Sequence, residues 1–299
     1  MLAFHSDRFA FPLPPGHRFP LAKYRMLREL LLERGILAPG ELAEAPLADF
    51  AELVLVHERG WVERVFRGEL DAAEQRRIGL PWSEMLVLRS RASVGGTVAA
   101  ARHALDHGIA GNLAGGTHHA FADHGEGYCV FNDIAVAIRV LQQEGRIRRA
   151  AVIDLDVHQG NGTAAIFAGD GDVFTFSMHG AKNFPFRKRT SHLDLELPDG
   201  MGDEAYLDVL REHLPLVLDR AQPEILLYQA GVDALADDAL GRLALSHQGL
   251  RARDACVFET ARAAGLPVVL TMGGGYARPI ERTVEAHAGT YELAKRILG

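Results

Sequence analysis

Residues 150–162 read AAVIDLDVHQGNG, and this stretch decides the fold. Its first four residues are small or branched and apolar, which is typical of a strand buried on both faces. Acidic residues, a histidine and two glycines follow at once, so the strand must end there. The stretch therefore predicts a buried strand over Ala150–Asp154 that leads directly into a polar loop.

Five further apolar runs are predicted to be strands: Glu52–Val56, Val173–Phe176, Leu193–Leu197, Ile225–Gln229 and Val268–Met272. Helical spacing of apolar residues predicts helices over Leu21–Glu33, Ser93–Asp106, Asp133–Gln143, Glu204–Ala221, His247–Ala264 and Ile280–Ile297. Alternating strands and helices of these lengths predict an α/β fold with a mainly parallel sheet and helices on both faces. No stretch resembles a linker, so we expect residues 1–299 to form one domain.

The composition is that of an ordinary globular protein, with 48% hydrophobic and 24% charged residues. The 39 acidic residues exceed the 32 basic ones, giving a net charge of −7, which argues against direct nucleic-acid binding. Only Cys129 and Cys256 are present, so no disulfide framework is expected. The chain starts without a signal-peptide pattern and has no run of about 18 apolar residues, so we expect a cytoplasmic protein that does not span a membrane.

Polar clusters follow five apolar runs, namely four of those given above and the short run Asn112–Ala114. They read GGTHHA from Gly115, DLDVHQGNG from Asp154, SMH from Ser177, GVD from Gly231 and GGGY from Gly273. Ligands of open parallel sheets bind outside the carboxyl ends of the strands. The five clusters are therefore expected to converge on one edge and to form an active site.

The acidic cluster indicates a metal site. Asp154, Asp156 and His158 alternate with apolar residues, so on an extended segment they would face the same side. Asp233 supplies a further carboxylate at another strand end. Asp156, His158 and Asp233 together would suit a catalytic zinc ion with a position left open for water, and the oxygen-rich set would also suit Fe²⁺. The alternative is that each acidic residue caps a helix or forms an ion pair.

Other clusters suggest the remaining chemistry. His118 and His119 follow a glycine pair and could serve as base and acid, although adjacent histidines are also common on surfaces. Tyr276 follows three glycines and could donate a hydrogen bond to an oxyanion, or could simply pack. Gly127-Tyr128 and Phe184 could line a slot for an aliphatic stem, with ordinary core packing as the alternative.

The motifs GGTHHA, GYCVFND, DLDVHQGNGT, FSMH, AGVD and GGGY resemble the histone deacetylase family in order and spacing. The opening pattern FxxPxGHRFPxxKY, from Phe11 to Tyr24, is similar to bacterial members, and DLDVHQGNG is similar to the bacterial and class IV-type branch. The resemblance implies an arginase/deacetylase fold with a parallel sheet of about eight strands. It also implies zinc at Asp156, His158 and Asp233.

The resemblance further implies that His118 and His119 form the acid/base pair, that Tyr276 polarises the acyl carbonyl, and that Asp154 orients His118. It implies a structural K⁺ site built from carbonyl oxygens and one serine, namely Asp154, Asp156, His158, Met178 and Ser177. Many relatives have an aspartate where this chain has Asn161. Because an amide does not stabilise an imidazolium as a carboxylate does, we expect a lower pKa for His119 than in those relatives.

The implied activity is zinc-dependent removal of an acetyl or longer acyl group from the ε-amine of lysine in a protein or peptide. Three alternatives stay open. The substrate could be an acetylated polyamine or another small acylated amine, the site could be an arginase-like centre with two metals, or the chain could bind acylated amines without turnover. The sequence does not define the acyl chain length, the native metal or the oligomeric state.

Overall fold

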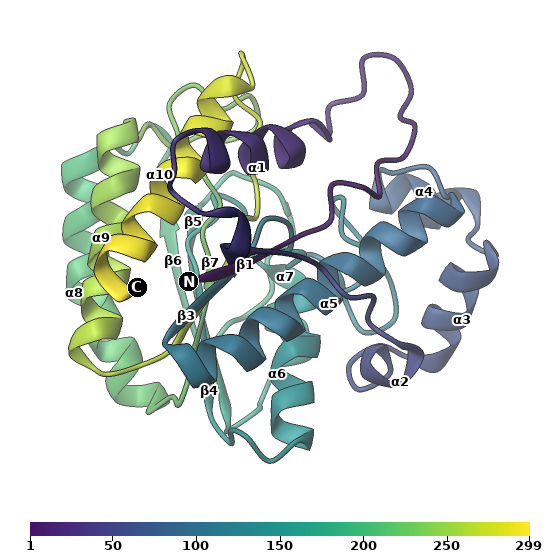
Figure 1. Ribbon diagram of the computed structural model, residues 1–299, viewed down its shortest axis with the longest axis horizontal. Helices are drawn as coiled ribbons and strands as arrows, with labels where there is room; N and C mark the ends of the chain where they lie inside the picture. Colours follow the sequence, from purple (N-terminus) through teal and green to yellow (C-terminus); the bar gives the residue numbers. More distant parts are fainter.

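A computed structural model describes residues 1–299, and its centre is one eight-stranded sheet with the order β2-β1-β3-β8-β7-β4-β5-β6 (Figure 1). All neighbouring strands pair in parallel. The strands are β1 (Leu2–His5), β2 (Leu42–Glu44), β3 (Ile109–Asn112), β4 (Ala150–Asp154), β5 (Val173–Gly180), β6 (Leu193–Leu197), β7 (Leu226–Gln229) and β8 (Val268–Thr271). The predicted α/β class with a parallel sheet of about eight strands is confirmed.

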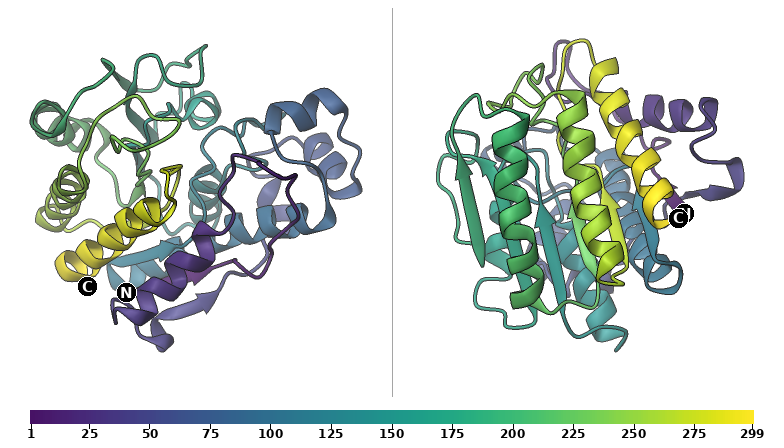
Figure 2. Two further views of the ribbon diagram at one scale, coloured as in Figure 1. Left: turned by 90° about the horizontal axis from the view of Figure 1, so that it is seen from above. Right: turned by 90° about the vertical axis from the view of Figure 1, so that its left-hand side faces the viewer.

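Helices cover both faces of this sheet. In chain order they are α1 (Lys23–Glu33), the 3-10 turn η1 (Pro39–Glu41), α2 (Phe50–Leu53), α3 (Arg59–Arg67), α4 (Ala72–Ile78), α5 (Glu84–His107), α6 (Asp133–Gln143), α7 (Asn161–Ile166), α8 (Asp203–Ala221), α9 (His247–Ala263) and α10 (Glu281–Leu298). The long helices α8, α9 and α10 lie side by side on one face, as Figure 2 shows. On the other face, α5 packs against α6.

Side-chain alternation along the strands separates two hydrophobic cores. In β4, Ala151 and Ile153 join the core under α1, α8, α9 and α10, whereas Ala150 and Val152 join the core that contains residues of α2 to α6. β7 follows the same rule, because Leu226 and Leu227 belong to different cores. Burial on both faces explains why these strands are apolar throughout.

One strand prediction is wrong. Glu52–Val56 does not form a strand, because α2 occupies Phe50–Leu53 and a turn follows it. A capping box starts this helix: the backbone N–H of Glu52 donates to Asp49 Oδ1 (2.8 Å) and the backbone N–H of Asp49 donates to Glu52 Oε2 (3.1 Å). The local cap therefore outweighs the strand propensity of the apolar residues after Glu52.

The other predicted elements are present, most of them with shifted ends. The strands predicted over Ala150–Asp154 and Leu193–Leu197 and the helix predicted over Asp133–Gln143 have the observed bounds. The helix predicted over Ser93–Asp106 is part of the longer α5, whose first turn is capped by the Ser83 hydroxyl. The sequence did not indicate the short strands β1 and β2 or the helices α3, α4 and α7.

The parallel sheet brings five polar residues into one row at its carboxyl edge. Across adjacent strands the register pairs Asn112 with Thr271, Thr271 with Gln229, Gln229 with Asp154, and Asp154 with Ser177. The loops that follow these strands therefore start at neighbouring points, as the positions of the polar clusters predicted.

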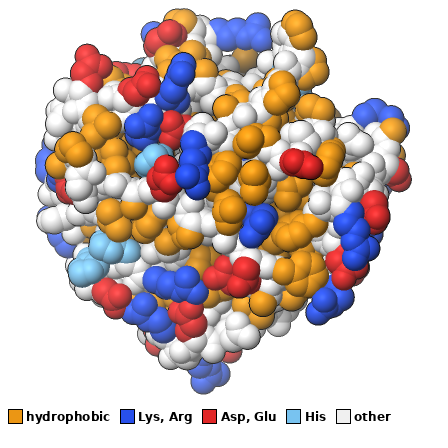
Figure 3. All heavy atoms as spheres, turned by 45° about the vertical axis from the view of Figure 1, so that its right-hand side comes forward, with side chains coloured by type: hydrophobic (Ala, Val, Ile, Leu, Met, Phe, Trp, Pro, Cys, Tyr) orange, Lys and Arg blue, Asp and Glu red, His pale blue; other side chains and the backbone are white.

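On the face drawn in Figure 3, acidic and basic side chains are interspersed with hydrophobic ones. No helix has both the length and the apolar character needed to cross a bilayer.

Candidate active site

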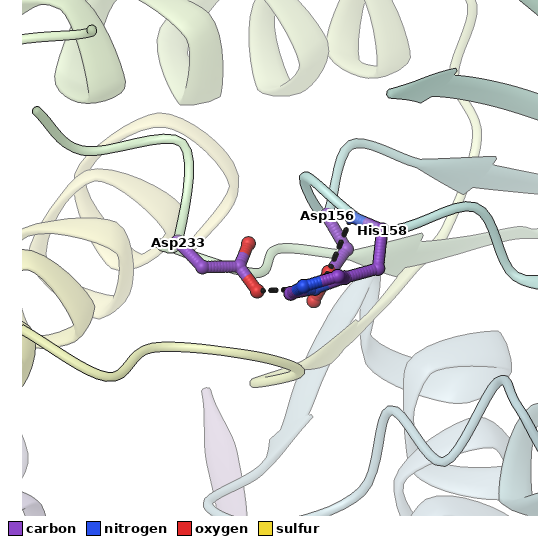
Figure 4. Close-up of side chains that lie close together, drawn as sticks. All are labelled: Asp156, His158 and Asp233. Carbon is purple, nitrogen blue, oxygen red and sulfur yellow. Dashed lines mark hydrogen bonds and ion pairs between the residues drawn. The ribbon is translucent and has the colours of Figure 1, made fainter. Parts of the chain in front are cut away.

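Three potential metal ligands meet just beyond the carboxyl ends of β4 and β7. The ligand atoms of Asp156, His158 and Asp233 all lie within 4.8 Å of one another. His158 Nδ1 lies 3.0 Å from Asp156 Oδ1 and 3.0 Å from Asp233 Oδ2. In Figure 4 the three side chains point toward one another from two separate loops. Two carboxylates and one imidazole form a donor set that fits a catalytic Zn²⁺ or Fe²⁺ ion.

Backbone amides fix the two carboxylates. Gly274 N–H donates to Asp156 Oδ2 (2.7 Å), and Val157 N–H donates to Asp233 Oδ1 (2.9 Å). The loop after β8 approaches the Asp233 carboxylate so closely that a Cβ on Gly274 would lie 1.8 Å from Asp233 Oδ2. Only glycine allows this approach, so the GGGY cluster helps to build the metal site as well as carrying Tyr276.

The triad is buried and carries more negative charge than its single imidazole can balance. Asp156 and Asp233 are 1% and 0% exposed. Burial and the neighbouring charge of Asp156 raise the pKa of Asp233 to about 7. Burial also acts against ionisation of Asp156, but His118 and His158 outweigh it and hold the pKa of this carboxyl well below its usual range. A divalent cation would balance both carboxylates.

The two adjacent histidines differ in their partners. His118 Nδ1 lies 2.7 Å from Asp154 Oδ2, and His119 Nδ1 lies 2.7 Å from Asn161 Oδ1. Burial opposes a charge on His118, but Asp154 and Asp156 outweigh it and raise its pKa to about 9. Burial, together with the charges of His118 and His158, lowers the pKa of His119 well below its usual value.

The orientation of Asn161 assigns the protons of His119. Asn161 Nδ2 donates to Glu126 Oε2 (3.0 Å), which leaves Asn161 Oδ1 as the acceptor that faces His119. Nδ1 of His119 therefore carries the hydrogen, and Nε2 keeps a free lone pair. This arrangement is that of a neutral base.

Tyr276 lines the same cavity as both histidines and Asp156. Its backbone N–H donates to Asp238 Oδ2 (2.6 Å), and Lys23 Nζ lies 5.3 Å from the centre of its ring. Burial, reinforced by the charge of Asp233, raises the pKa of Tyr276 well above its usual value, so the hydroxyl stays protonated. It can therefore donate a hydrogen bond to an oxygen in the cavity.

The three predicted channel residues lie at the entrance to this cavity. The ring of Phe184 lies edge-on to that of His119, with 5.0 Å between the centroids, and the ring of Tyr128 lies 6.2 Å from that of Tyr276. Gly127 has a φ of +54°, and a Cβ there would lie 2.7 Å from His119 Cδ2. The residue at this position must therefore be glycine for the entrance to stay open beside His119.

The strict alternation expected for Asp154, Asp156 and His158 does not persist, because β4 ends at Asp154. Asp154 points to His118, whereas Asp156 and His158 turn toward Asp233. Among the residues predicted for a structural cation, Asp154 lies opposite Ser177 in the register of β4 and β5. Met178 is the next residue of β5 and is fully buried.

A family model of the histone deacetylase domain matches residues 17–291. The chain belongs to the histone deacetylase family. It is 31% identical over 277 residues to histone deacetylase 2 of Arabidopsis thaliana, covering 90% of this chain and 72% of that protein. It is also 31% identical over 283 residues to a histone deacetylase-like amidohydrolase of Pseudomonas aeruginosa, covering 89% and 74% of the two chains.

Solved structures of the family agree with this assignment. The fold matches an HDAC homolog from Aquifex aeolicus with a TM-score of 0.84 at 25% identity, over 98% of this chain and 84% of that one. A complex of an HDAC homolog with SAHA matches with the same TM-score, identity and coverage. The family resemblance and the fold class expected from the motifs are confirmed, and the family is one of deacetylases and amidohydrolases.

Three residues that support the site were not found from the sequence. Glu126 orients Asn161, and Asp238 accepts a hydrogen bond from the backbone N–H of Tyr276. Lys23 Nζ donates to the carbonyl oxygens of Gly273 (3.2 Å) and Gly275 (3.4 Å) in the glycine turn. Glu126 lies inside the GYCVFND region and could have been suspected there. Lys23 is the lysine of the FxxPxGHRFPxxKY pattern, but its contact, like that of Asp238, joins distant segments and could not be inferred from the sequence.

Proposed function

We propose that residues 1–299 form one catalytic domain that hydrolyses the amide between an acetyl or longer acyl group and the ε-amine of lysine in peptides or proteins. One observation carries this proposal: Asp156 and His158 of the triad, the differently held histidine pair and the protonated Tyr276 line a single cavity, and Asp233 lies directly beside it against His158. These are the groups needed to activate water, to move protons and to stabilise an oxyanion.

We further propose that Asp156, His158 and Asp233 hold Zn²⁺, with Fe²⁺ as the alternative. The bound ion would supply positive charge that polarises the acyl carbonyl and acidifies water. A structural K⁺ bound by Ser177, Met178 and the backbone of Asp154, Asp156 and His158 is part of the same proposal. The pairing of Asp154 with Ser177 at the ends of β4 and β5 supports it.

The protein's own residues account for the proton movements. His119 is neutral with a free Nε2, so it takes a proton from the attacking water. The Tyr276 hydroxyl donates a hydrogen bond to the acyl oxygen as negative charge develops there. His118, held by Asp154, keeps positive charge beside the reacting centre and provides a proton as the amine leaves.

The charge of the entrance favours acyl-lysine peptides over acetylated polyamines. The outer pocket shares His119, Tyr128 and Tyr276 with the inner cavity. It is lined by no acidic residue and by five basic ones: Arg18, Arg76, Arg77, Lys182 and Arg242. Lys182 and Arg242 share one carboxylate, that of Asp199, at 3.7 and 3.2 Å. A polyamine carries several positive charges and would be repelled here.

An arginase-like centre needs ligands for a second metal. The structure contains one group of three His, Cys, Asp or Glu side chains arranged to hold an ion. Asn161, an amide, occupies the position beside His119 where a further carboxylate would assist a second ion. The donor set therefore supports a single-metal hydrolase.

The decisive test uses Tyr276→Phe on the zinc-loaded protein with an acetyl-lysine peptide. Removing the hydroxyl leaves the metal ligands intact, so we expect kcat to fall by about 100-fold or more while the metal content stays unchanged. Tyr291→Phe, which removes a buried hydroxyl outside the cavity, should keep full activity. Full activity of Tyr276→Phe would remove this tyrosine from the mechanism.

A substrate panel separates the remaining functions. Acetyl-lysine and fatty-acyl-lysine peptides, acetylspermidine and arginine would be assayed side by side. We expect the peptides to be hydrolysed with higher kcat/KM than acetylspermidine, and arginine not at all. Tight binding of acyl peptides with no turnover under Zn²⁺ or Fe²⁺ would instead support a protein that only binds acylated amines.

A further inference from the structure

The entrance to the active site concentrates positive charge. We define the entrance rim as the five basic residues that line the outer pocket, which are Arg18, Arg76, Arg77, Lys182 and Arg242. All five are exposed. No acidic residue lines this pocket, although the chain as a whole has a net charge of −7. The sign of the charge at the entrance is therefore opposite to that of the protein as a whole.

The acidic residues close to Arg76 and Arg77 in the chain have other partners. Glu74 Oε1 accepts a hydrogen bond from Arg64 Nη2 (2.8 Å), and the Asp71 side chain caps the first turn of α4. No carboxylate lies within 4.0 Å of the guanidinium group of Arg76 or Arg77. These two guanidinium groups are therefore available to a ligand.

The remaining rim residues have a single carboxylate between them. Lys182 Nζ and Arg242 Nη1 both approach Asp199 Oδ2, at 3.7 and 3.2 Å, and Arg18 forms no ion pair. Positive charge in the last turn of a helix stabilises that helix, which accounts for the two arginines of α4. The other three rim residues lie outside helices, so this explanation does not extend to them.

The backbone beneath the rim is tied to the entrance. Gly127 N–H donates to the carbonyl oxygen of Arg77 (3.1 Å), which holds the end of α4 against the entrance. Asn183 Nδ2 donates to the carbonyl oxygen of Leu240 (2.9 Å), which joins the segments that carry the lysine and the last arginine of the rim. The charges are thus arranged before a ligand arrives, which reduces the entropy lost on binding.

The surroundings of the rim favour a peptide ligand. Phe186 is 86% exposed, and its ring lies edge-on to that of Phe184 with 6.3 Å between the centroids. Both rings line the outer pocket, so an apolar side chain of a bound peptide can pack there. A nucleic acid would extend beyond the rim onto a protein with excess negative charge, which would repel it. An acidic peptide carries its charge only near the entrance.

We propose that the entrance rim selects acyl-lysine that has aspartate or glutamate among its immediate neighbours in the peptide. This inference rests on the proposed function and names its class of substrate. Each arginine of the rim can donate two parallel hydrogen bonds to a peptide carboxylate. Because the rim is exposed, salt screens its charges, and the preference depends on ionic strength.

The first experiment compares three acetyl-lysine peptides of equal length, with two glutamates, two glutamines or two lysines on each side of the acetyl-lysine. At about 50 mM salt we expect kcat/KM for the glutamate peptide to exceed that for the glutamine peptide about fivefold and that for the lysine peptide about 20-fold. The difference lies in KM, and it falls to about twofold or less at about 0.5 M salt.

The double variant Arg76→Gln/Arg77→Gln tests whether the rim causes this preference. The ratio of kcat/KM for the glutamate and glutamine peptides is taken within each protein, so a general loss of activity cancels. We expect the ratio to fall from about fivefold to about twofold or less. Arg242→Gln, which changes no helix, should lower the ratio to about threefold.

Arg25→Gln/Arg211→Gln is the matched control. It removes the same amount of charge from exposed positions on α1 and α8 that do not line the outer pocket. This variant should keep the ratio of the wild type. Melting temperatures show whether all variants are folded. Equal kcat/KM for the three peptides, or the same fall in ratio in the control, would overturn the proposal.

A single-stranded oligonucleotide of about ten nucleotides tests the other polyanion. Little binding at about 0.15 M salt is expected. Equal hydrolysis of the three peptides together with tight oligonucleotide binding would assign the rim to nucleic acid and reject the peptide.

A binding measurement separates this inference from the proposed function. Peptides with norleucine in place of acetyl-lysine keep the aliphatic stem but have no amide to hydrolyse, and calorimetry gives their Kd for the zinc-loaded protein. Binding of the glutamate peptide about tenfold tighter than the lysine peptide, with the difference lost in Arg76→Gln/Arg77→Gln, supports the rim. If no acyl-lysine is hydrolysed, that outcome rejects only the proposed function. Equal binding of both peptides, or binding of neither, contradicts the rim.

Discussion

Two clusters of buried charge lie close together in this protein and differ in how their charges are balanced. In the first, Asp156 and Asp233 share one imidazole, that of His158, beside a cavity. In the second, Asp254 Oδ1 accepts hydrogen bonds from Nε (2.9 Å) and Nη2 (2.7 Å) of Arg253, and both residues are almost fully buried.

The second cluster is complete within the protein. The two oxygens of Asp254 also accept hydrogen bonds from the hydroxyls of Tyr228 (2.6 Å) and Thr290 (2.6 Å). Every charge there has a partner, so the cluster is structural. The first cluster has excess negative charge and an open side, which is the condition for binding a cation. The balance of charge, rather than burial alone, therefore distinguishes a structural cluster from a binding site.

The complete cluster also supports the incomplete one. Arg253 Nη1 donates to the carbonyl oxygens of Leu155 (3.2 Å) and Gly231 (2.6 Å). Leu155 precedes Asp156, and Gly231 lies two residues before Asp233. One buried guanidinium thus fixes the backbone of both loops that carry the carboxylate ligands.

The largest expected effect comes from Asp156→Asn. It removes one of the three proposed metal ligands, so we expect loss of bound metal and a fall in kcat/KM of about 1000-fold or more. The metal-free variant should change in stability by less than about 1 kcal/mol, because His158 and Asp233 remain as a balanced pair. Metal analysis, an acetyl-lysine assay and urea unfolding measure these quantities. A variant that retains metal and activity would show that Asp156 is not a ligand.

Asp254→Asn should show the opposite pattern. It leaves the Arg253 charge buried without a carboxylate, so we expect the free energy of unfolding to fall by about 3–5 kcal/mol. Thr290→Val removes only one hydrogen bond to the same carboxylate and should cost about 1 kcal/mol. Urea unfolding of both variants measures the difference. Equal, small effects would mean that the ion pair does not stabilise the fold.

His57 provides a smaller test of how buried groups affect stability, because its buried imidazole is neutral. Its Nδ1 lies 2.9 Å from the Phe121 carbonyl oxygen, its Nε2 accepts the Asn132 N–H (2.9 Å), and burial lowers its pKa to about 4. The unfolded chain takes up a proton near pH 6.5 and the folded protein near pH 4. The stability due to neutral His57 is therefore complete above pH 6.5 and is lost as the pH falls toward 4, by about 3 kcal/mol.

His57→Gln should remove this pH dependence. The variant is expected to be less stable at pH 7 because a fitted side chain is replaced, but its stability should fall less steeply between pH 6.5 and 4. Unfolding measured at a series of pH values gives the slope, which reports proton uptake. An unchanged slope would show that another group is responsible.

The sequence was most informative where chemistry follows a buried strand. The run before Asp154 specified both a strand and the start of a polar loop, and the parallel sheet then brought the loops together. The apolar residues after Glu52 misled us because a local capping box, rather than hydrophobicity, determines the structure there. The strands β1 and β2 were missed because neither is a continuous apolar run: they read LAFH and LAE and have only four and three residues.

The supporting residues could not be predicted because their partners are distant in the chain. Arg253 donates to a carbonyl oxygen 98 residues away, and Arg89 contacts Ser6 across 83 residues. Each looks like an ordinary helical arginine in the sequence. Only the folded structure shows that one is paired and the other is not.

Metal reconstitution tests the central claim, that the unbalanced charge of Asp156, His158 and Asp233 holds one catalytic cation. Chelator-treated protein would be titrated with Zn²⁺ while acetyl-lysine peptide hydrolysis and bound zinc are both measured. We predict no activity without metal and a linear rise that saturates at one ion per chain. Full activity in protein that holds less than about one ion per ten chains, or saturation only at two ions per chain, would contradict the account.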